Sequence, residues 1–387
     1  MIIPRTYQAD AIDVGVKYFN GDANYNAIEI LPTGSGKSVV IANTAMALED
    51  KTIVFQPSKE ILIQNLNKFL SYGYRAGVYS ASAGSKFIDK ITFATIGSVI
   101  NKQHLFRDCK NIIIDECHLV NSKGGMYHEF IKNIPGAKVL GMTATPYRLA
   151  SSSFGAELRF ITRTNPRIFN RVLYYIQNDV LFNAGHLAQL EYFNFDVVNR
   201  SMLKTNSTGT DFTDASLKSY YKQINMSQLT AGYANRLLAK RKNLLVFCAL
   251  VAEAHEVSRM IPGSVVIHGE LSQQACSEIQ AKFLSNTIRC VIAVGKWTTG
   301  FDKPDLEALL IAKSTMSLAL YYQWVGRIMR PFTYLDGTKK VGWVVDLGGN
   351  IKFFGKIETM KININAKGLY SIWNNGRQLT NVPFTKN

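Results

Sequence analysis

The segment Leu31-Pro32-Thr33-Gly34-Ser35-Gly36-Lys37-Ser38 decides the fold of this chain. The apolar run of residues 27–31 leads into it, and a second apolar run, residues 39–46, follows it. The first run predicts a strand and the second predicts the start of a helix. A glycine-rich turn between a strand and a helix directs several backbone N–H groups and the positive end of the helix dipole at one point, where a polyphosphate can bind.

The residue types in this turn predict a phosphate loop. Lys37 would reach the β- and γ-phosphates of a nucleotide, and the Ser38 hydroxyl would help to hold Mg²⁺. The backbone of the preceding residues would surround the phosphates: Thr33, Gly34, Ser35 and Gly36. Leu31 stands where the general G-x-x-x-x-G-K-[ST] pattern has its first glycine, so only the second half of the pattern is met. Taken alone, the segment could also be an ordinary loop.

Length and charge limit the class of protein. The chain has 387 residues, of which 47% are hydrophobic, and this length fits two or three domains. Its 44 Lys and Arg against 28 Asp and Glu give a net charge of +16. Such a basic excess favours a polyanionic partner, with nucleic acid as the leading candidate. The alternative is a basic protein without such a partner.

The cysteines and the N-terminus predict a soluble intracellular protein. No two of the five cysteines form a C-x-x-C pair, so no zinc site is expected. An odd number of cysteines without a disulfide framework fits a reducing compartment. Residues 1–30 lack a signal-peptide pattern, and no apolar run approaches the length of a membrane span, so no membrane contact is expected.

Short apolar runs alternate with helix-like stretches in two series. The runs of the first series are residues 52–55, 91–93, 112–114 and 139–141, and those of the second are 244–247, 265–267, 291–294, 308–311 and 342–345. Continuous apolar runs suit strands buried on both faces, and strand–helix alternation implies parallel sheets. We therefore predict an α/β protein with two domains, joined by residues 148–243. Sites in such sheets lie at the carboxyl ends of the strands.

Two further strands end in residues suited to phosphate chemistry. Asp115 and Glu116 follow the run 112–114. Asp115 could hold Mg²⁺, and Glu116 could orient and deprotonate an attacking water. After the next strand, Thr143 and Thr145 could hydrogen-bond the 115–118 loop, which includes His118, and relay its state. The alternative for each group is a polar strand end without a role.

The second half of the chain carries arginines at helical spacing. Gln323, Arg327 and Arg330 would lie near one face of a helix. Two arginines can stabilise the charge on a transferring phosphoryl group, which is worth about 10³–10⁵ in rate for an arginine finger. Upstream, Gly300 could approach a phosphate and Asp302 could accept from a ribose hydroxyl or an arginine. A solvated basic helix and a plain turn are the alternatives.

The N-terminal residues Arg5, Tyr7 and Gln8 precede the phosphate loop by about two dozen positions. A glutamine amide can both donate to and accept from the edge of adenine, which would select ATP. Arg5 or Tyr7 could pack nearby.

The order of these motifs resembles that of superfamily 2 helicases over residues 1–346, where the first glycine of the phosphate loop is commonly absent. The resemblance implies two tandem RecA-like domains with parallel sheets and an ATP site in the cleft between them, with ATP and Mg²⁺ as cofactors. We place the first domain at residues 1–184, the second at 185–346, and a basic extension at 347–387.

Within this superfamily the chain resembles the bacterial RadD (YejH) group. The resembling stretches are residues 115–118, 143–149, 212–217, 298–302, 325–330 and 346–350. That group acts on DNA in repair and recombination and carries a cysteine-rich C-terminal module. No cysteine follows Cys290 here, so we expect a compact relative without that module, in the cytoplasm of a bacterium or a phage-infected cell.

The resemblance also implies nucleic-acid contacts. The matching positions are Pro57, Ser58, Lys59, Thr95, Gly97, Ser98, Ala249, His268, Gly269, Thr298 and Thr299. The expected function is an ATP-dependent helicase or translocase that acts on single-stranded, duplex or branched DNA in replication, repair or recombination. Two alternatives stay open: an RNA helicase, and a nucleotide-gated binding or remodelling module that does not unwind.

Overall fold

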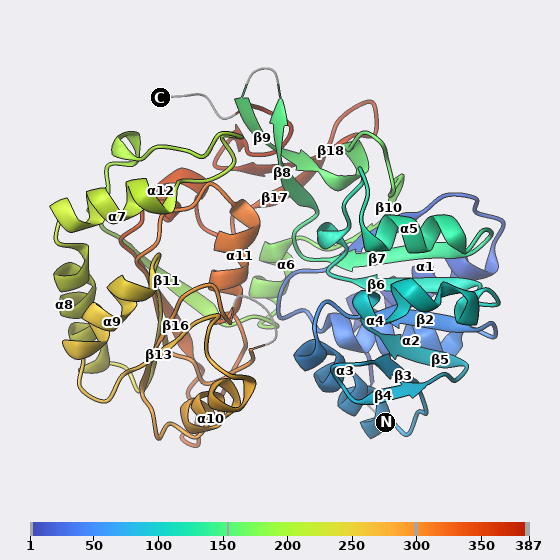
Figure 1. The fold of residues 1–387 in the computed structure, drawn as a ribbon, viewed down its shortest axis with the longest axis horizontal. Coiled ribbons are helices and arrows are strands. Elements are labelled where there is room, and N and C mark those ends of the chain that lie inside the picture. Colours follow the sequence, from blue (N-terminus) through green and yellow to red (C-terminus); the bar gives the residue numbers. More distant parts are fainter. Residues whose placement is uncertain (1–2, 153–154, 298–300, 384–387) are drawn as a thin grey trace. The chain divides into compact units, whose positions relative to one another are not determined.

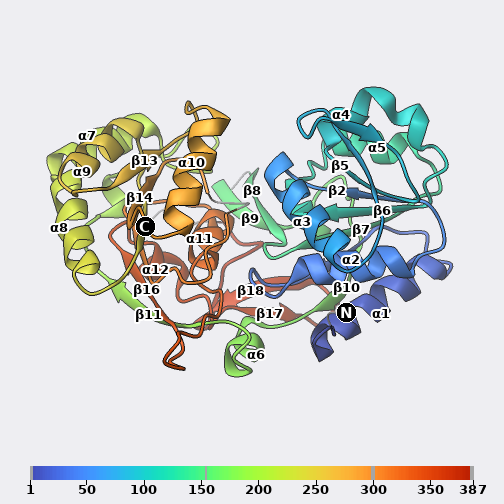
Figure 2. The ribbon, with the colours of Figure 1, turned by 90° about the horizontal axis from the view of Figure 1, so that it is seen from below.

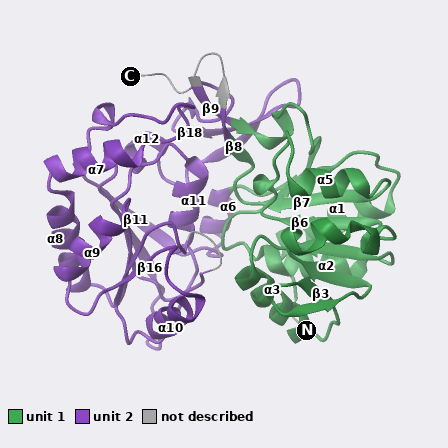
Figure 3. Cartoon of the chain, viewed as in Figure 1, with its two compact units in different colours: residues 1–148, 159–177 green, residues 149–158, 178–387 purple. Residues whose placement is uncertain are grey.

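The computed structural model describes residues 3–152, 155–297 and 301–383. Backbone contacts divide the chain into two compact units, shown in Figure 3. The first unit comprises residues 1–148 and 159–177, and the second comprises residues 149–158 and 178–387. Each unit is built around its own sheet, which confirms the α/β fold with parallel-rich sheets.

The sheet of the first unit has eight strands. Figures 1 and 2 label several of them, among them β2, β5, β6 and β7. Their order is β10 (Arg171–Tyr175), β1 (Ala27–Ile30), β7 (Lys138–Thr143), β6 (Asn111–Asp115), β2 (Thr52–Phe55), β5 (Ile91–Ala94), β3 (Gly77–Ser80) and β4 (Ser85–Phe87). All neighbours pair in parallel except β3 and β4. The helices are α1 (Thr6–Asn20), α2 (Lys37–Ala47), α3 (Lys59–Ser71), α4 (Ile96–Val99) and α5 (Met126–Asn133).

Burial explains which strands the sequence predicted. Strands β1, β2, β5 and β6 are buried at every position, so their residues are mostly apolar. Strand β10 lies at the sheet edge with its first residue exposed and the others half-buried, and its apolar run 172–175 was not among the strands predicted from the sequence. It comes from the stretch 148–243, so this stretch is not simply a connection between the domains.

Glu29 is an exception in the core of the first unit. It lies in β1 with no exposed surface, and neither carboxylate oxygen has a hydrogen-bond partner among the described residues. A side-chain carbon added at Gly15 of α1 would come within 3.0 Å of its Oε1 atom. Burial raises the pKa of Glu29 to about 8, so the carboxyl is neutral in the folded chain at neutral pH.

Glu29→Gln is expected to stabilise the chain increasingly as pH rises from about 5 to 8. In this interval the unfolded glutamate ionises while the folded one keeps its proton, so the wild type loses stability with rising pH. Glutamine does not titrate, and each pKa unit is worth about 1.4 kcal/mol. Urea unfolding followed by circular dichroism at pH 5, 6.5 and 8 measures the difference, and a difference that does not change with pH would contradict this assignment.

The sheet of the second unit has six strands, all parallel. Their order is β11 (Gln189–Asn194), β16 (Val341–Asp346), β15 (Ala308–Ile311), β12 (Leu244–Phe247), β14 (Cys290–Ala293) and β13 (Val265–Ile267). The longer helices are α7 (Asp214–Gln223), α8 (Met226–Leu238), α9 (Val251–Arg259), α10 (Gln273–Leu284) and α11 (Leu318–Gly326). A short helix α6 (Asn178–Asn183) precedes β11, and β8 (Tyr147–Ser152) pairs with β9 (Gly155–Phe160).

The C-terminal stretch, for which the sequence made no structural prediction, is folded onto the second unit. It contains α12 (Asn350–Phe354) and an antiparallel sheet of β17 (Lys361–Ile364), β18 (Tyr370–Asn374) and β19 (Arg377–Gln378). The Asn374 amide donates to the carbonyls of Phe354 and Lys356, at 2.8 and 2.9 Å. Gly355 has a φ of +84°, and a side chain there would collide with the Asn374 amide. These contacts fix the small sheet to the end of α12.

No helix in the described part of the chain is long and apolar enough to cross a membrane. All five cysteines are free thiols, and four of them are buried.

Candidate nucleotide site and nucleic-acid interface

The predicted phosphate loop connects β1 to α2 as expected from the sequence. Gly34 and Gly36 have φ values of +83° and +84°, which glycine adopts without strain. Gly36 is the N-terminal cap of α2, so Lys37 and Ser38 form the first turn of an eleven-residue helix. No side chain of the cap residue bonds the N–H groups of this first turn, and the N-terminus of a helix is a common binding site for anions.

The start of α1 packs on this loop. The Tyr7 hydroxyl donates to the Ser35 carbonyl at 2.5 Å, and the Gln8 amide donates to the same carbonyl at 2.8 Å. The Gln8 carbonyl oxygen accepts from the backbone N–H of Arg5 at 2.9 Å. Tyr7 and Gln8 are both buried. The amide that the sequence assigned to adenine therefore also holds the phosphate loop, and a side chain at Gly36 would lie 2.5 Å from it.

Lys37 and Glu116 form an ion pair in the site. The Lys37 ammonium lies 2.8 Å from the Glu116 Oε1 atom, and both side chains are largely buried. Glu116 has a φ of +52°, an unfavourable conformation for a glutamate, which typically costs about 1–3 kcal/mol. His118 contacts the second carboxylate oxygen, Oε2, at 3.2 Å. These two partners fix the Glu116 carboxylate in place.

The two adjacent carboxyls have opposite pKa shifts. Burial, with the nearby Glu116 charge, raises the pKa of Asp115 to about 7. Burial also opposes ionisation of Glu116, but the Lys37 charge and the contacts from His118 outweigh it, so the pKa of Glu116 lies well below its usual range. Divergent pKa values in neighbouring carboxyls are typical of groups with separate roles. Of the two carboxyls, Asp115 is the one whose ionised form a nearby cation would stabilise most.

The residues present fit a Mg²⁺ ion bound together with a nucleotide. Ser38 and Asp115 supply the oxygen ligands that Mg²⁺ prefers. Among the described residues no three His, Cys, Asp or Glu side chains cluster to form a protein-only metal site. Mg²⁺ commonly uses one or two protein oxygens and completes its shell with phosphate oxygens and water. These donors are therefore compatible with Mg²⁺ bound together with a nucleotide.

The structure brings the three predicted coupling residues together. The His118 Nδ1 atom lies 2.9 Å from the Thr143 hydroxyl and 3.2 Å from the Thr145 hydroxyl. All three side chains are buried. Thr143 is the last residue of β7, so this cluster connects the end of that strand to the loop that carries Glu116.

Two side chains of α3 reach this site and were missed by the sequence analysis. The Asn65 amide donates to the Asp115 carboxylate at 3.3 Å and to the Gln56 side chain at 2.9 Å. The Lys68 ammonium donates to the Ser38 hydroxyl at 3.0 Å. No motif marks these positions, and their spacing of three residues on a helix is the only signal in the sequence.

In the second unit, Arg330 is paired with Asp302. Its guanidinium makes two hydrogen bonds to the Asp302 carboxylate, at 2.9 and 2.5 Å. The Arg327 guanidinium donates to the Phe301 carbonyl at 2.5 Å. Both predicted arginines thus contact the loop after β14. Gly300, Thr298 and Thr299 lie outside the described residues.

The prediction that Gln323, Arg327 and Arg330 share one helical face is wrong for Arg330. Helix α11 ends at Gly326, and Arg327 is its C-terminal cap. The chain then turns so that Ile328 and Met329 enter the core. The Met329 carbonyl accepts a hydrogen bond from the Ala188 N–H, which draws the backbone away from the helix axis.

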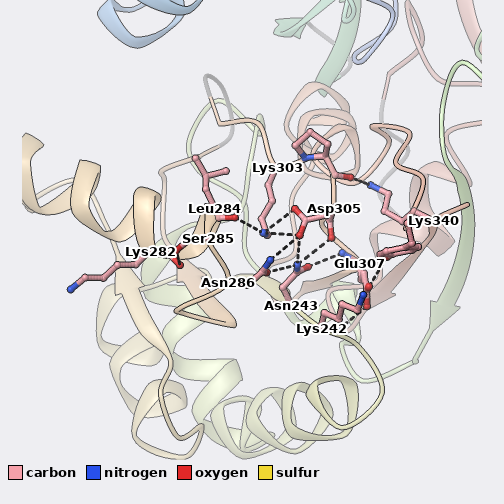
Figure 4. A network of polar contacts seen from close by, with 12 residues as sticks. Lys242, Asn243, Lys282, Leu284, Ser285, Asn286, Lys303, Asp305, Glu307 and Lys340 are labelled. Carbon is pink, nitrogen blue, oxygen red and sulfur yellow. Dashed lines mark hydrogen bonds and ion pairs between the residues drawn. The ribbon is translucent and has the colours of Figure 1, made fainter. Parts of the chain in front are cut away.

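A buried polar network holds the residues that follow Asp302 (Figure 4). The Lys303 side chain is fully buried, with its ammonium 2.9 Å from the Asp305 carboxylate. Asn243 and Asn286 also donate to Asp305, at 3.4 and 3.0 Å. The Lys340 ammonium donates to the Pro304 carbonyl at 2.6 Å. These bonds fix the segment between Asp302 and β15.

The predicted nucleic-acid contacts lie at the carboxyl ends of strands in both units. Residues 57–59 follow β2 and residues 95–98 follow β5, while Ala249 follows β12. His268 and Gly269 follow β13. The Thr95 hydroxyl lies 3.0 Å from the Ser80 and Ser98 hydroxyls, so these side chains also shape their own loop.

Comparisons with known families agree with this arrangement. Residues 1–148 match the family model of the type III restriction enzyme res subunit, and residues 227–331 match that of the helicase conserved C-terminal domain. The two matches stand in the order of the paired domains of helicases, which agrees with the two α/β units of the chain.

Similar proteins act on different nucleic acids. A 51.5 kDa protein of a Lactococcus phage (isolate 7-9) is 23% identical over 307 residues, covering 77% of this chain and 61% of the phage protein. The DNA 3'-5' translocase XPB2 of Sulfurisphaera tokodaii is 23% identical over 363 residues, covering 84% of this chain and 78% of its own length. The fold is similar to that of Saccharomyces cerevisiae Dbp5 bound to RNA and ADP BeF3, with a TM-score of 0.59 at 16% identity, over 92% of this chain and 88% of Dbp5. The chain thus spans less than two thirds of the phage protein.

Proposed function

We propose that the chain couples ATP hydrolysis to movement along nucleic acid, as a DNA helicase or translocase. The observation that carries the proposal is the phosphate loop whose Lys37 forms an ion pair with Glu116, the residue next to Asp115. Glu116 is positioned by Lys37 and His118, which keep it ionised, although its affinity for a proton stays low as long as Lys37 is paired with it. Bound Mg²⁺, held by Ser38 and Asp115, would neutralise phosphate charge.

The arginines of the second unit complete the proposed chemistry. We assign Arg327 and Arg330 to the charge that develops on the transferring phosphate of ATP held by the first unit. The paired Asp302 orients Arg330 through two hydrogen bonds. Gln323 of α11 lies one turn before Arg327, whose Nε donates to its carbonyl. As part of this proposal, the first RecA-like domain ends at residue 184 and the second at residue 346.

Nucleic acid is assigned to the loops at the carboxyl ends of β2, β5, β12 and β13. The net charge of +16 supports a polyanionic ligand, and phosphate contacts carry no sequence information. DNA is favoured by the resemblance to the RadD group, and a bacterial or phage-infected cell is the proposed setting. An RNA substrate and a module that binds without unwinding are the alternatives.

Binding of nucleic acid is expected to weaken steeply with salt. Each phosphate neutralised releases counterions, so the logarithm of the association constant should fall with a slope of about −0.7 to −0.9 per phosphate contact. The slope is measured by fluorescence anisotropy of a labelled oligonucleotide, at salt concentrations from about 50 to 300 mM. A flat response would argue against phosphate-dominated binding.

One parallel assay separates these functions. ATP hydrolysis is measured without nucleic acid and with single-stranded DNA, duplex DNA, forked DNA and RNA, together with release of a labelled strand from the fork. We expect DNA to stimulate hydrolysis more than RNA and the strand to be released. Stimulation by RNA alone would favour the RNA helicase, and stimulation without strand release would favour a translocase or remodelling module.

A further inference from the structure

Helix α3 places two polar side chains on the proposed metal ligands. Asn65 and Lys68 are three residues apart, so they lie on one face of the helix. The Asn65 amide bonds Asp115 and the Lys68 ammonium bonds Ser38. The same helix begins at Lys59, next to the loop assigned to nucleic acid. Neither residue belongs to the motifs from which the nucleotide site was predicted.

The two contacts differ in their consequences for a metal ion. Asn65 is neutral and donates to one carboxylate oxygen of Asp115, while the other accepts from the Glu116 N–H at 2.9 Å. Each carboxylate oxygen keeps acceptor capacity, so Asn65 orients Asp115 without blocking it. Lys68 instead brings a positive charge to the Ser38 hydroxyl, the oxygen that holds Mg²⁺ in this motif.

We propose that Lys68 is an internal competitor of Mg²⁺ at Ser38, which must leave this hydroxyl when the metal–nucleotide complex binds. The inference rests on the proposed function, because it takes the phosphate loop to be a nucleotide site. Its basis is the 3.0 Å contact between two partly buried side chains from different elements. An ammonium group is a compact charge that makes strong hydrogen bonds to oxygen, so it can take the place of a cation there.

Electrostatics sets the direction of the effect. Two cations on one oxygen repel each other, and the repulsion is stronger in a partly buried site than in water. Lys37 pairs with Glu116 at 2.8 Å, so its charge lies beside that carboxylate. Removal of the Lys68 charge should therefore make the site easier to load with Mg²⁺, although it removes a positive charge from a site for an anionic nucleotide.

The test is the Mg²⁺ dependence of nucleotide binding, which does not require turnover. A fluorescent ADP analogue is titrated at a series of Mg²⁺ concentrations and in excess EDTA, with the full chain. Lys68→Met should lower the Mg²⁺ concentration for half-maximal binding by about tenfold, the size expected for loss of one charge-assisted hydrogen bond. In EDTA its affinity for the analogue should be no higher than that of the wild type.

A second variant and a control keep the result interpretable. Lys68→Gln retains an N–H donor without the charge, and it should show the same shift. It serves as the test if Lys68→Met does not fold. Lys86→Met, which removes an exposed lysine from β4, should leave the Mg²⁺ dependence unchanged. An unchanged or raised Mg²⁺ requirement in both Lys68 variants would overturn the proposal and would mark Lys68 as a phosphate ligand or a bystander.

This failure differs from failure of the proposed function. If the wild type binds the analogue in a Mg²⁺-dependent manner and the Lys68 variants need as much Mg²⁺ as the wild type, only the proposed role of Lys68 is refuted. If the wild type binds no nucleotide at any Mg²⁺ concentration, the nucleotide site itself is refuted.

Discussion

Glu116→Gln is expected to keep ATP binding while ATP turnover falls by at least about 10², the lower range for loss of a general base. The amide has nearly the shape of the carboxylate but cannot take a proton from water. In the wild type this carboxylate is held by Lys37 and His118, and the Lys37 charge keeps its pKa low despite burial. Its position is thus set before any ligand binds. In the variant Lys37 loses its anionic partner and becomes more available to phosphate.

The measurement combines single-turnover ATP hydrolysis with equilibrium binding of ATP at saturating Mg²⁺. Glu129→Gln is the matched control, since it makes the same chemical change on the exposed side of α5. The control should hydrolyse ATP at the wild-type rate. Near-normal turnover in Glu116→Gln would show that another group accepts the proton.

Arg330→Ala is expected to leave ATP binding largely intact and to cut turnover by about 10³ or more, as for loss of an arginine finger. Lys37 and the backbone of the phosphate loop would still hold the nucleotide. The lost group is one that stabilises charge in the transition state alone, so kcat should fall and KM should change little. Stimulation by nucleic acid should also disappear.

The change also leaves Asp302 without its bidentate partner, which must be separated from the catalytic effect. Arg330→Lys retains a charge for Asp302 but lacks the planar two-donor geometry, so it should stay slow. Arg259→Ala, an exposed arginine at the end of α9, is the control and should retain activity. Wild-type stimulation of Arg330→Ala by DNA or RNA would refute the finger assignment.

The sequence predicted the strands that are buried on both faces, because burial enforces uninterrupted apolar runs. Strands β2, β6 and β12 carry such runs, β1 carries one that Glu29 interrupts, and each strand ends where a motif begins. The C-terminal strand β17 alternates polar and apolar residues, and the edge strand β10 is only half-buried, so the place of both depends on packing partners far away in sequence. Such partners leave no periodic signal.

Within the site, residue types were predictable but several contacts were not. The pairing of Lys37 with Glu116 joins residues that are 79 positions apart, and the spacing of motifs does not encode it. Gln8 was assigned to a base, yet its amide also supports Ser35. The turn after α11 follows from the burial of Ile328 and Met329, which helical spacing alone cannot anticipate. Asn65 and Lys68 lie in an ordinary amphipathic helix and carry no motif.

The most direct test of the central claim is the ATP hydrolysis rate with and without saturating nucleic acid, in the wild type and in Lys37→Ala. The account predicts a wild-type rate that nucleic acid raises many-fold. It predicts neither hydrolysis nor stimulation in the variant, because the Lys37 ammonium that would contact the β- and γ-phosphates is lost. A wild-type rate that no DNA or RNA changes at low salt, or stimulated hydrolysis in Lys37→Ala, would contradict it.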